Sequence, residues 1–313
     1  MTNLSEFTFL SSDGKTQLHG MLWEAEGVAV RAVLQICHGV AEHIARYDGF
    51  ARALNEQGIV VAGHDHLGHG KSLPEGGTPV YFGDGNTWNT VVDDIYVLHQ
   101  RLKQRYPDVP LCIMGHSMGS FLTRTYLIRY PGTVKAAVIM GTGWQPRAAI
   151  TGGLALANAI AAVSGENATS ELVTELAFGS YNKLFAPNRT KVDWLSADES
   201  NVDDYIADPL CGADATVGLF RQMLHGIRFN QRQSHLRQMD REMPVLFVAG
   251  DKDPVGNCGK GVRQTYDAFR AAGMRDCTLK LYPGLRHEIL NEKAYTADIT
   301  KNIEAWLLSR LEK

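Results

Sequence analysis

The sequence predicts an α/β protein with a mostly parallel sheet, helices on both faces of that sheet, and a helical segment inserted between two of its strands. Short apolar runs typical of interior strands alternate with helical stretches up to about residue 141. The alternation then stops and resumes only near residue 244. We therefore expect a core formed by residues 1–141 and 233–313, and an inserted helical cap, or lid, formed by residues 142–232.

Eight segments have the pattern of strands. Residues 5–10 and 17–23 alternate polar and apolar side chains around a turn at residues 12–15, which predicts an antiparallel hairpin at one edge of the sheet. The other six are apolar runs typical of interior strands: 32–37, 59–62, 111–114, 135–141, 244–249 and 278–282. Helical periodicity lies between them and again in the cap, at 149–163 and 217–227.

Composition is that of an ordinary globular protein. The 313 residues are 44% hydrophobic and 21% charged, and a net charge of −3 gives no basic surface for nucleic acid, so no nucleic-acid partner is expected. Five cysteines without C-x-x-C pairs predict free thiols and a cytoplasmic, reducing location. The N-terminal residues lack a signal-peptide pattern, and the uncharged stretch 148–165 is too weakly apolar to predict a membrane span.

The segment Gly115-His116-Ser117-Met118-Gly119 lies between an apolar strand pattern and a helical one. Glycine–x–serine–x–glycine in this context is typical of a nucleophile elbow, a tight turn that exposes the central hydroxyl at the start of a helix. Ser117 is therefore the candidate nucleophile, and the N–H of Met118 is a candidate oxyanion donor. Without that context the pattern would indicate only a glycine-rich loop.

A second oxyanion donor is expected after the third predicted strand. Residues 32–37 end in His38-Gly39-Val40, and many hydrolases place a backbone donor in this loop. The candidate is the amide of Val40. The alternative is a plain connection between a strand and a helix.

Two later strand ends supply a candidate acid and base. Asp253, in the stretch Gly250-Asp251-Lys252-Asp253, is the preferred partner to orient a histidine, with Asp251 as the alternative. His287 follows the last predicted strand and is the candidate base, unless it is a surface histidine. The chain order Ser117, Asp253, His287 is the order used by the α/β-hydrolase fold.

Three histidines and an aspartate in residues 64–69 have the residue types of a metal site. No cysteine or carboxylate cluster completes a ligand set there, and Gly68 and Gly70 indicate a tight turn. We favour a structural, hydrogen-bonded loop. Neither a metal nor an organic cofactor is expected.

Together these features resemble the monoacylglycerol lipase and lysophospholipase group of serine α/β-hydrolases. The matching stretches are HGVAEHIARY (38–47), HDHLGHGKS (64–72), GHSMG (115–119), YIADPL (205–210), the Asp253 turn and the His287 loop. The resemblance implies an α/β-hydrolase fold with a mostly parallel eight-stranded sheet, and cleavage of one acyl ester on a small polar headgroup. It also implies that Glu42, Arg46 and Tyr205 lie around the headgroup pocket. Mammalian members have a second histidine where this chain has Leu290, which leaves the headgroup open.

The expected activity is thus hydrolysis of a monoacylglycerol or a lysophospholipid-like ester through an acyl-enzyme. Other hydrolase activities stay open: short-chain carboxylesterase, feruloyl esterase or aminopeptidase. A non-catalytic ligand-binding protein on the same fold is the alternative of another class. The cap is either ordinary core packing or a lid whose apolar face binds an acyl chain, with transient contact to a membrane surface.

Overall fold

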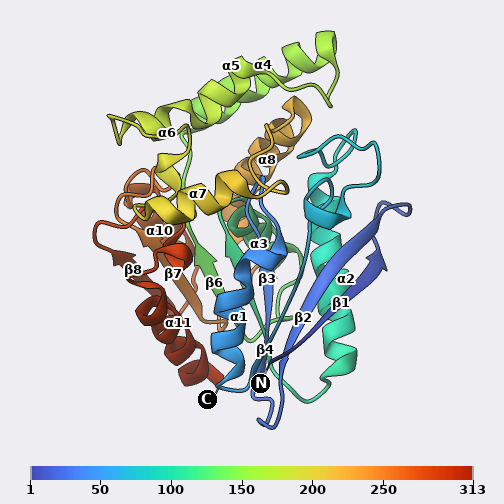
Figure 1. The fold of residues 1–313 in the computed structure, drawn as a ribbon, viewed down its shortest axis with the longest axis vertical. Helices are drawn as coiled ribbons and strands as arrows, with labels where there is room; N and C mark the ends of the chain where they lie inside the picture. The colour runs from blue at the N-terminus through green and yellow to red at the C-terminus, as the bar shows by residue number, and fades with distance from the viewer. Residues whose placement is uncertain (1, 312–313) are drawn as a thin grey trace.

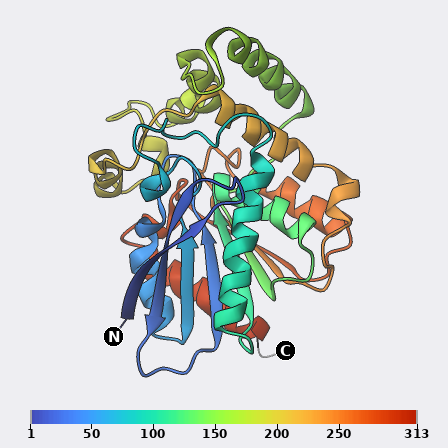
Figure 2. The same ribbon diagram turned by 90° about the vertical axis from the view of Figure 1, so that its right-hand side faces the viewer.

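The computed structural model describes residues 2–311, except for the side chains of residues 176 and 177. A single twisted sheet forms the centre, with helices on both of its faces (Figures 1 and 2). Helices of residues 142–232 lie across one end of this core, and both chain termini lie at the opposite end (Figure 1).

The eight strands are ordered β1-β2-β4-β3-β5-β6-β7-β8. Their bounds are β1 Thr2–Leu10, β2 Gln17–Ala25, β3 Ala32–Cys37, β4 Ile59–His64, β5 Leu111–His116, β6 Ala136–Met140, β7 Val245–Gly250 and β8 Cys277–Tyr282. β1 and β2 form an antiparallel hairpin, β2 also pairs antiparallel with β4, and all other pairings are parallel. The predicted α/β-hydrolase fold class is confirmed.

The interior strands read as continuous apolar runs because both of their faces are covered. β3, β4, β5, β6 and β7 are buried at every position, whereas edge strand β1 is mostly exposed. Because these strands run parallel, their carboxyl ends lie at one edge of the sheet, beneath the cap. The loops that follow the strands converge at this edge.

Two groups of helices cover the sheet. α1 (Asp48–Asn55) and α11 (Thr296–Leu311) bury their apolar stripes in one core. α2 (Trp88–Arg105), α3 (Met118–Arg129) and α10 (Lys260–Ala271) bury theirs in the other core. Single turns of 3₁₀ helix occur in the connecting loops: η1 Ile44–Tyr47, η2 Gly70–Ser72 and η5 Ile289–Asn291.

No strand of the sheet comes from residues 142–232. This segment and the turn that follows it contain α4 Arg147–Ser164, α5 Glu171–Thr174, the π-helical turn η3 Glu175–Gly179, α6 Ser180–Lys183, η4 Asp193–Leu195, α7 Glu199–Ala207, α8 Val217–Asn230 and α9 Gln233–Leu236. α8 fastens the segment to the core, because Asn230 donates to the Phe121 carbonyl at 2.8 Å and accepts from the Thr125 hydroxyl at 2.9 Å.

α4 is the most exposed of the long helices. It packs on α8 and buries Ile150, Leu154 and Ala157, which are spaced as one helical stripe. Among the described residues, α4 is the one helix long and apolar enough to cross a membrane by length and composition, with a mean hydropathy of 1.3. Only 17% of it is buried inside the protein.

Candidate active site

Ser117 lies at the junction of β5 and α3, where the chain turns sharply. Its backbone has φ 53° and ψ −121°, a conformation that costs a non-glycine residue on the order of 1–3 kcal/mol. The N–H of Ser117 donates to the carbonyl of Met140 in β6 at 3.0 Å, which ties the strained turn to the neighbouring strand.

Both glycines of the elbow are required by close backbone contacts. A Cβ on Gly119 would lie 2.1 Å from the carbonyl oxygen of Cys37, at the end of β3. A Cβ on Gly115 would lie 2.3 Å from the carbonyl of Gly119 and from the Thr123 hydroxyl. The absence of side chains lets α3 begin directly against the sheet, which places Ser117 at the sheet edge.

His287 and Asp253 come from the loops after β8 and β7. The two side chains are joined by a 3.0 Å hydrogen bond between Nδ1 and Oδ1, and Asp253 is completely buried. The same Asp253 oxygen accepts the N–H of Val255 at 2.9 Å, which fixes the carboxylate. An Nδ1 that donates to Asp253 leaves Nε2 of His287 as the nitrogen able to take a proton.

Asp251, the alternative to Asp253, has a different partner. Its carboxylate accepts the N–H of Gly284 at 2.8 Å and thereby closes the turn after β8. It makes no hydrogen bond to His287 within the described part of the chain. The geometry therefore favours Asp253 as the residue that orients the imidazole.

The loop after β3 passes close to the nucleophile. A Cβ on Gly39 would lie 3.1 Å from Cβ of Ser117. The N–H of Gly39 donates to Oε1 of Glu42 at 2.5 Å, whereas no acceptor within residues 2–311 takes the N–H of Val40 or of Met118. These two amides remain available to an oxyanion beside Ser117, and their role stays a prediction.

Glu42 is the central acceptor behind this loop. Besides the Gly39 amide, its Oε1 accepts from the Tyr47 hydroxyl at 3.0 Å and from His116 Nδ1 at 3.2 Å. Burial by itself would raise the pKa of Glu42. The hydrogen bond from His116 and the charge of Arg46 outweigh burial and hold that pKa well below its usual value. Glu42 is therefore a buried carboxylate.

Arg46 lies between two carboxylates. It contacts Glu42 at 2.9 Å and makes two 2.7 Å bonds to Glu288, the residue after His287. Asn201 of α7 also donates to Glu288, at 2.8 Å, and the Arg46 guanidinium stacks 5.0 Å from the centre of the Tyr205 ring. This network joins the loop after β3, the histidine loop and the cap.

Two cavities open beside Ser117, and both are lined by Val40, Phe178 and Trp194. The first, here the Glu42 cavity, has a volume of about 590 Å³ and also contacts His287 and Tyr205. The second, here the α8 cavity, has a volume of about 420 Å³. Most of the residues that line it have apolar side chains, including Met118, Phe121, Ile150, Leu184, Phe220, Met223, Leu224 and Ile227. Ser117 thus lies where the two spaces adjoin.

Of the predicted pocket residues, Glu42 and Tyr205 line the Glu42 cavity, but Arg46 does not. Its charge is neutralised by Glu42 and Glu288, and its side chain is only 10% exposed. Tyr205 is also partly occupied, because its hydroxyl donates to the carbonyl of Ala41 at 3.0 Å. Arg46 is thus placed behind the cavity wall, where it holds two of the wall's carboxylates.

The histidines at 64, 66 and 69 are fully buried with His38 and contact one another through their rings. Burial lowers the pKa of both His64 and His69 to about 3, so these rings are neutral. Their ring nitrogens do not gather as a metal-ligand group among residues 2–311. The adjacent Asp65 receives the N–H groups of Ile44 and Lys71, as expected for a structural loop.

Comparison with known proteins places the chain in a family. Residues 28–294 match the model of the serine aminopeptidase S33 family, which covers most of the chain. The chain belongs to this family. Within it, this hydrolase is a member of the monoacylglycerol lipase-like group of serine hydrolases.

Relatives and solved structures agree with this placement. A monoacylglycerol lipase from Mycolicibacterium smegmatis is 32% identical over 90% of this chain and 89% of its own length. The human monoglyceride lipase is 27% identical over 96% of this chain and 89% of its own length. A carboxyl esterase from Bacillus coagulans, solved in complex with glycerol, superposes with a TM-score of 0.91 at 26% identity, covering 98% of this chain and 99% of that one.

Three residues of the hydrolase site carry no sequence signal of their own. His116 packs 4.7 Å from the His287 ring, and although burial lowers its pKa, Glu42 raises it above the usual histidine value. Trp194 of the cap lies 5.1 Å from the same ring. Glu288 is visible in the sequence only as a neighbour of His287. The contacts of these residues join segments far apart in the chain, so spacing could not reveal them.

The Arg46–Glu288 pair should make stability depend on pH. Burial raises the pKa of Glu288, but Arg46 outweighs burial and lowers it below the usual value. A carboxyl with a depressed folded-state pKa adds stability above its unfolded pKa of about 4.3, and loses it as pH falls through the folded-state pKa. We expect Glu288→Gln to lower the free energy of unfolding by about 2–4 kcal/mol at pH 7, and by less below pH 4.

Urea unfolding at pH 7, 5, 4 and 3 measures this difference. Glu242→Gln is the matched control, because Glu242 pairs with Arg275 on the exposed surface and should change stability by no more than about 0.5 kcal/mol. An equal loss for Glu288→Gln at pH 7 and pH 3 would contradict the assignment of the pair.

Proposed function

We propose that this hydrolase cleaves the acyl ester of monoacylglycerol or lysophospholipid-like substrates through an acyl-enzyme on Ser117. The observation that carries the proposal is the position of Ser117 between two cavities of different lining. The α8 cavity offers apolar side chains for a hydrocarbon chain. The Glu42 cavity offers carboxylates, amides and a tyrosine for a small hydroxylated headgroup.

The reaction would begin with attack of the Ser117 hydroxyl on the ester carbonyl. Nε2 of His287 takes the hydroxyl proton, while Asp253 fixes the tautomer and stabilises the imidazolium. Negative charge then develops on the carbonyl oxygen, which the N–H groups of Val40 and Met118 would bind. Each such donor is worth about 3 kcal/mol of transition-state stabilisation.

Collapse of the tetrahedral intermediate expels the alcohol, which receives its proton from His287. A water molecule, activated by the same histidine, then attacks the acyl-enzyme and releases the fatty acid. Glu42 supports these steps by fixing the Gly39 amide, so that Val40 is presented to the oxyanion. No step of this sequence requires a cofactor.

The name of the family raises aminopeptidase activity as a second candidate. An aminopeptidase must bind a positively charged amino terminus, usually with a free carboxylate. Apart from Asp253, the buried carboxylates beside the site are Glu42 and Glu288, and Arg46 is already paired with both of them. This occupancy favours a neutral headgroup and supports the ester substrate.

Replacement of the nucleophile tests the mechanism. We expect Ser117→Ala to lower kcat for a monoacylglycerol by at least about 10⁴-fold, because no other group can form the acyl-enzyme. Labelling by a fluorophosphonate, read by intact mass, should be lost with it. Ser234→Ala, an exposed serine of α9, is the control and should label and turn over normally. A panel of monoacylglycerols, lysophospholipids, p-nitrophenyl esters and aminoacyl arylamides then separates the candidate substrates.

A filled α8 cavity should discriminate by chain length. Met223 lines that cavity and is 9% exposed. We expect Met223→Trp to reduce kcat/KM for a long-chain monoacylglycerol by about 10-fold or more, while an acetyl or butyryl ester is hydrolysed as before. An equal loss on both esters would place the acyl chain elsewhere, and the short ester also reports that the variant is folded.

We also propose transient contact between the cap and a lipid surface. The helices α4, α5 and α6 form one end of the molecule (Figures 1 and 2). Three apolar side chains are exposed there: Val163 of α4 (87% exposed), Leu172 of α5 (54%) and Leu184, which directly follows α6 (60%). Leu184 also lines the α8 cavity, so one of these exposed side chains borders the space beside Ser117. A lipid ester could then pass from an aggregate to the site with little exposure to water.

Sedimentation with phosphatidylcholine vesicles tests this contact. We expect Leu184→Asp to lower the bound fraction several-fold, because a carboxylate resists transfer from water to the lipid interface. Leu4→Asp, which alters an exposed leucine of β1 far from the cap, is the control. Equal binding by both variants would exclude the cap as the contact.

All five cysteines are free, which supports the proposed cytoplasmic location.

A further inference from the structure

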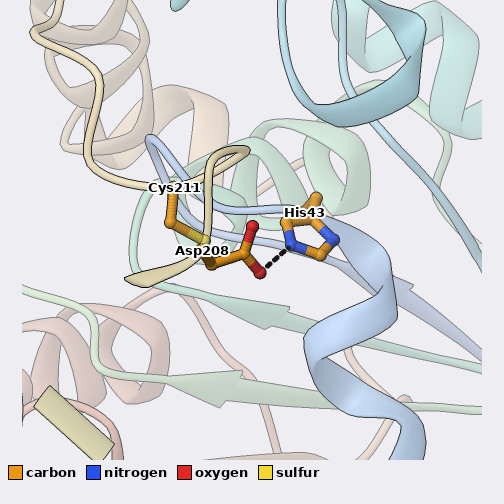
Figure 3. Close-up of side chains that lie close together, drawn as sticks. All are labelled: His43, Asp208 and Cys211. Carbon is orange, nitrogen blue, oxygen red and sulfur yellow. Dashed lines mark hydrogen bonds and ion pairs between the residues drawn. The ribbon is translucent and has the colours of Figure 1, made fainter. Parts of the chain in front are cut away.

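His43, Asp208 and Cys211 form a cluster that the hydrolytic mechanism does not use. His43 precedes η1 in the core, and the other two lie in the loop that follows α7 of the cap. Figure 3 shows the imidazole, the carboxylate and the thiol gathered in one place. Their ligand atoms lie within 4.8 Å of one another, and no other such group of three occurs in the described part of the chain.

The donor set is that of a zinc site. Zn²⁺ is bound by cysteine sulfur, histidine nitrogen and carboxylate oxygen, in a tetrahedron with bonds of about 2.0–2.3 Å. Ligand atoms in such a tetrahedron are about 3.3–3.7 Å apart. Side-chain rotations that move these atoms by about 1 Å would therefore complete the geometry. Magnesium and calcium prefer sites made only of oxygen, which this one is not.

Hydrogen bonds already orient two of the three side chains. Nε2 of His43 donates to one oxygen of Asp208 at 2.9 Å, and the other oxygen accepts the N–H of Leu210 at 2.9 Å. The Cys211 thiol has no hydrogen-bond partner among the described residues. His43 is 8% exposed, whereas the Asp208 side chain is 29% exposed, so an ion can enter from the Asp208 side.

The surrounding charge also suits a cation. Arg46 of the adjoining network carries one positive charge and is paired with two carboxylates, Glu42 and Glu288. Asp208 adds one more negative charge. A divalent cation would therefore enter a negatively charged surrounding.

We propose that His43, Asp208 and Cys211 bind one Zn²⁺ ion, with a water molecule as the fourth ligand. The site is separate from Ser117, Asp253 and His287 and takes no part in ester cleavage. Its role is structural: the ion links the cap loop to the core loop that carries Gly39 and Val40.

Binding replaces one proton by the metal. Cys211 ligates as a thiolate, so its S–H bond breaks, the S–Zn bond forms and the proton passes to solvent. His43 ligates through a nitrogen that carries no proton, which is Nε2 once the ring proton resides on Nδ1. Asp208 ligates as a carboxylate.

The link would add to contacts that already join these loops. The N–H of Gly212 and the hydroxyl of Tyr205 both donate to the carbonyl of Ala41, each at 3.0 Å. A metal bond between Cys211 and His43 would restrain the same two segments more strongly. Because Gly212 and Ala41 also line the Glu42 cavity, the ion would stabilise one wall of that cavity.

The test uses the untagged 313-residue chain, reduced and freed of metal with a chelator. Competition against a chromophoric chelator should give one tight Zn²⁺ site per chain, and Co²⁺ should give a thiolate-to-cobalt absorption band in the near ultraviolet. Cys211→Ser should abolish the cobalt band and weaken Zn²⁺ at least about 10-fold. Cys277→Ser, which alters a half-buried free thiol in β8, is the matched control and should keep both.

Thermal unfolding supplies a second readout. Zn²⁺ at 100 times its dissociation constant should raise the unfolding midpoint of the unaltered protein by about 2–5 °C and leave that of Asp208→Asn unchanged. Circular dichroism shows whether each variant is folded. If Cys211→Ser does not fold, Asp208→Asn is used in its place. A cobalt complex without a thiolate band, or equal Zn²⁺ affinity in the folded ligand variants and the control, overturns the proposal.

Discussion

The approach of α3 to the end of β3 is the contact on which the rest of the site depends. Gly119 meets the Cys37 carbonyl so closely that any side chain would push the helix away from the sheet. This contact keeps Ser117 in its strained conformation and aims the start of α3 at the loop that carries Val40. Core packing on both faces of the sheet stabilises an arrangement that the local backbone alone would not favour.

A buried charge network then connects three segments that are distant in the sequence. Glu42 shapes the loop after β3, Arg46 neutralises Glu42, and Glu288 holds Arg46 from the loop that bears His287. Buried charges are costly when alone, so each requires the others. The loop carrying the candidate oxyanion donor and the loop carrying the candidate base are thereby held at a fixed distance, and Asn201 extends the network to the cap.

The cap divides the space above Ser117. Trp194 and Phe178 contribute to both cavities, and Trp194 also packs against His287. One cavity is bounded by the apolar stripe of α8, and the other by the polar residues of the loop after β3. The cap therefore gives the site its shape on both sides, while the sheet edge positions the candidate nucleophile, acid and base.

Sequence patterns alone predict the fold class and the residues of the candidate triad. Apolar runs of strand length, the tight Gly115–Gly119 turn and the order Ser117, Asp253, His287 are local signals, because each reflects the geometry of a few consecutive residues. The folded structure was needed to show that Arg46 lies behind the cavity wall and that His43 lies beside Asp208 and Cys211. Those contacts join residues far apart in the chain, and long-range pairing leaves no periodic trace in a single sequence.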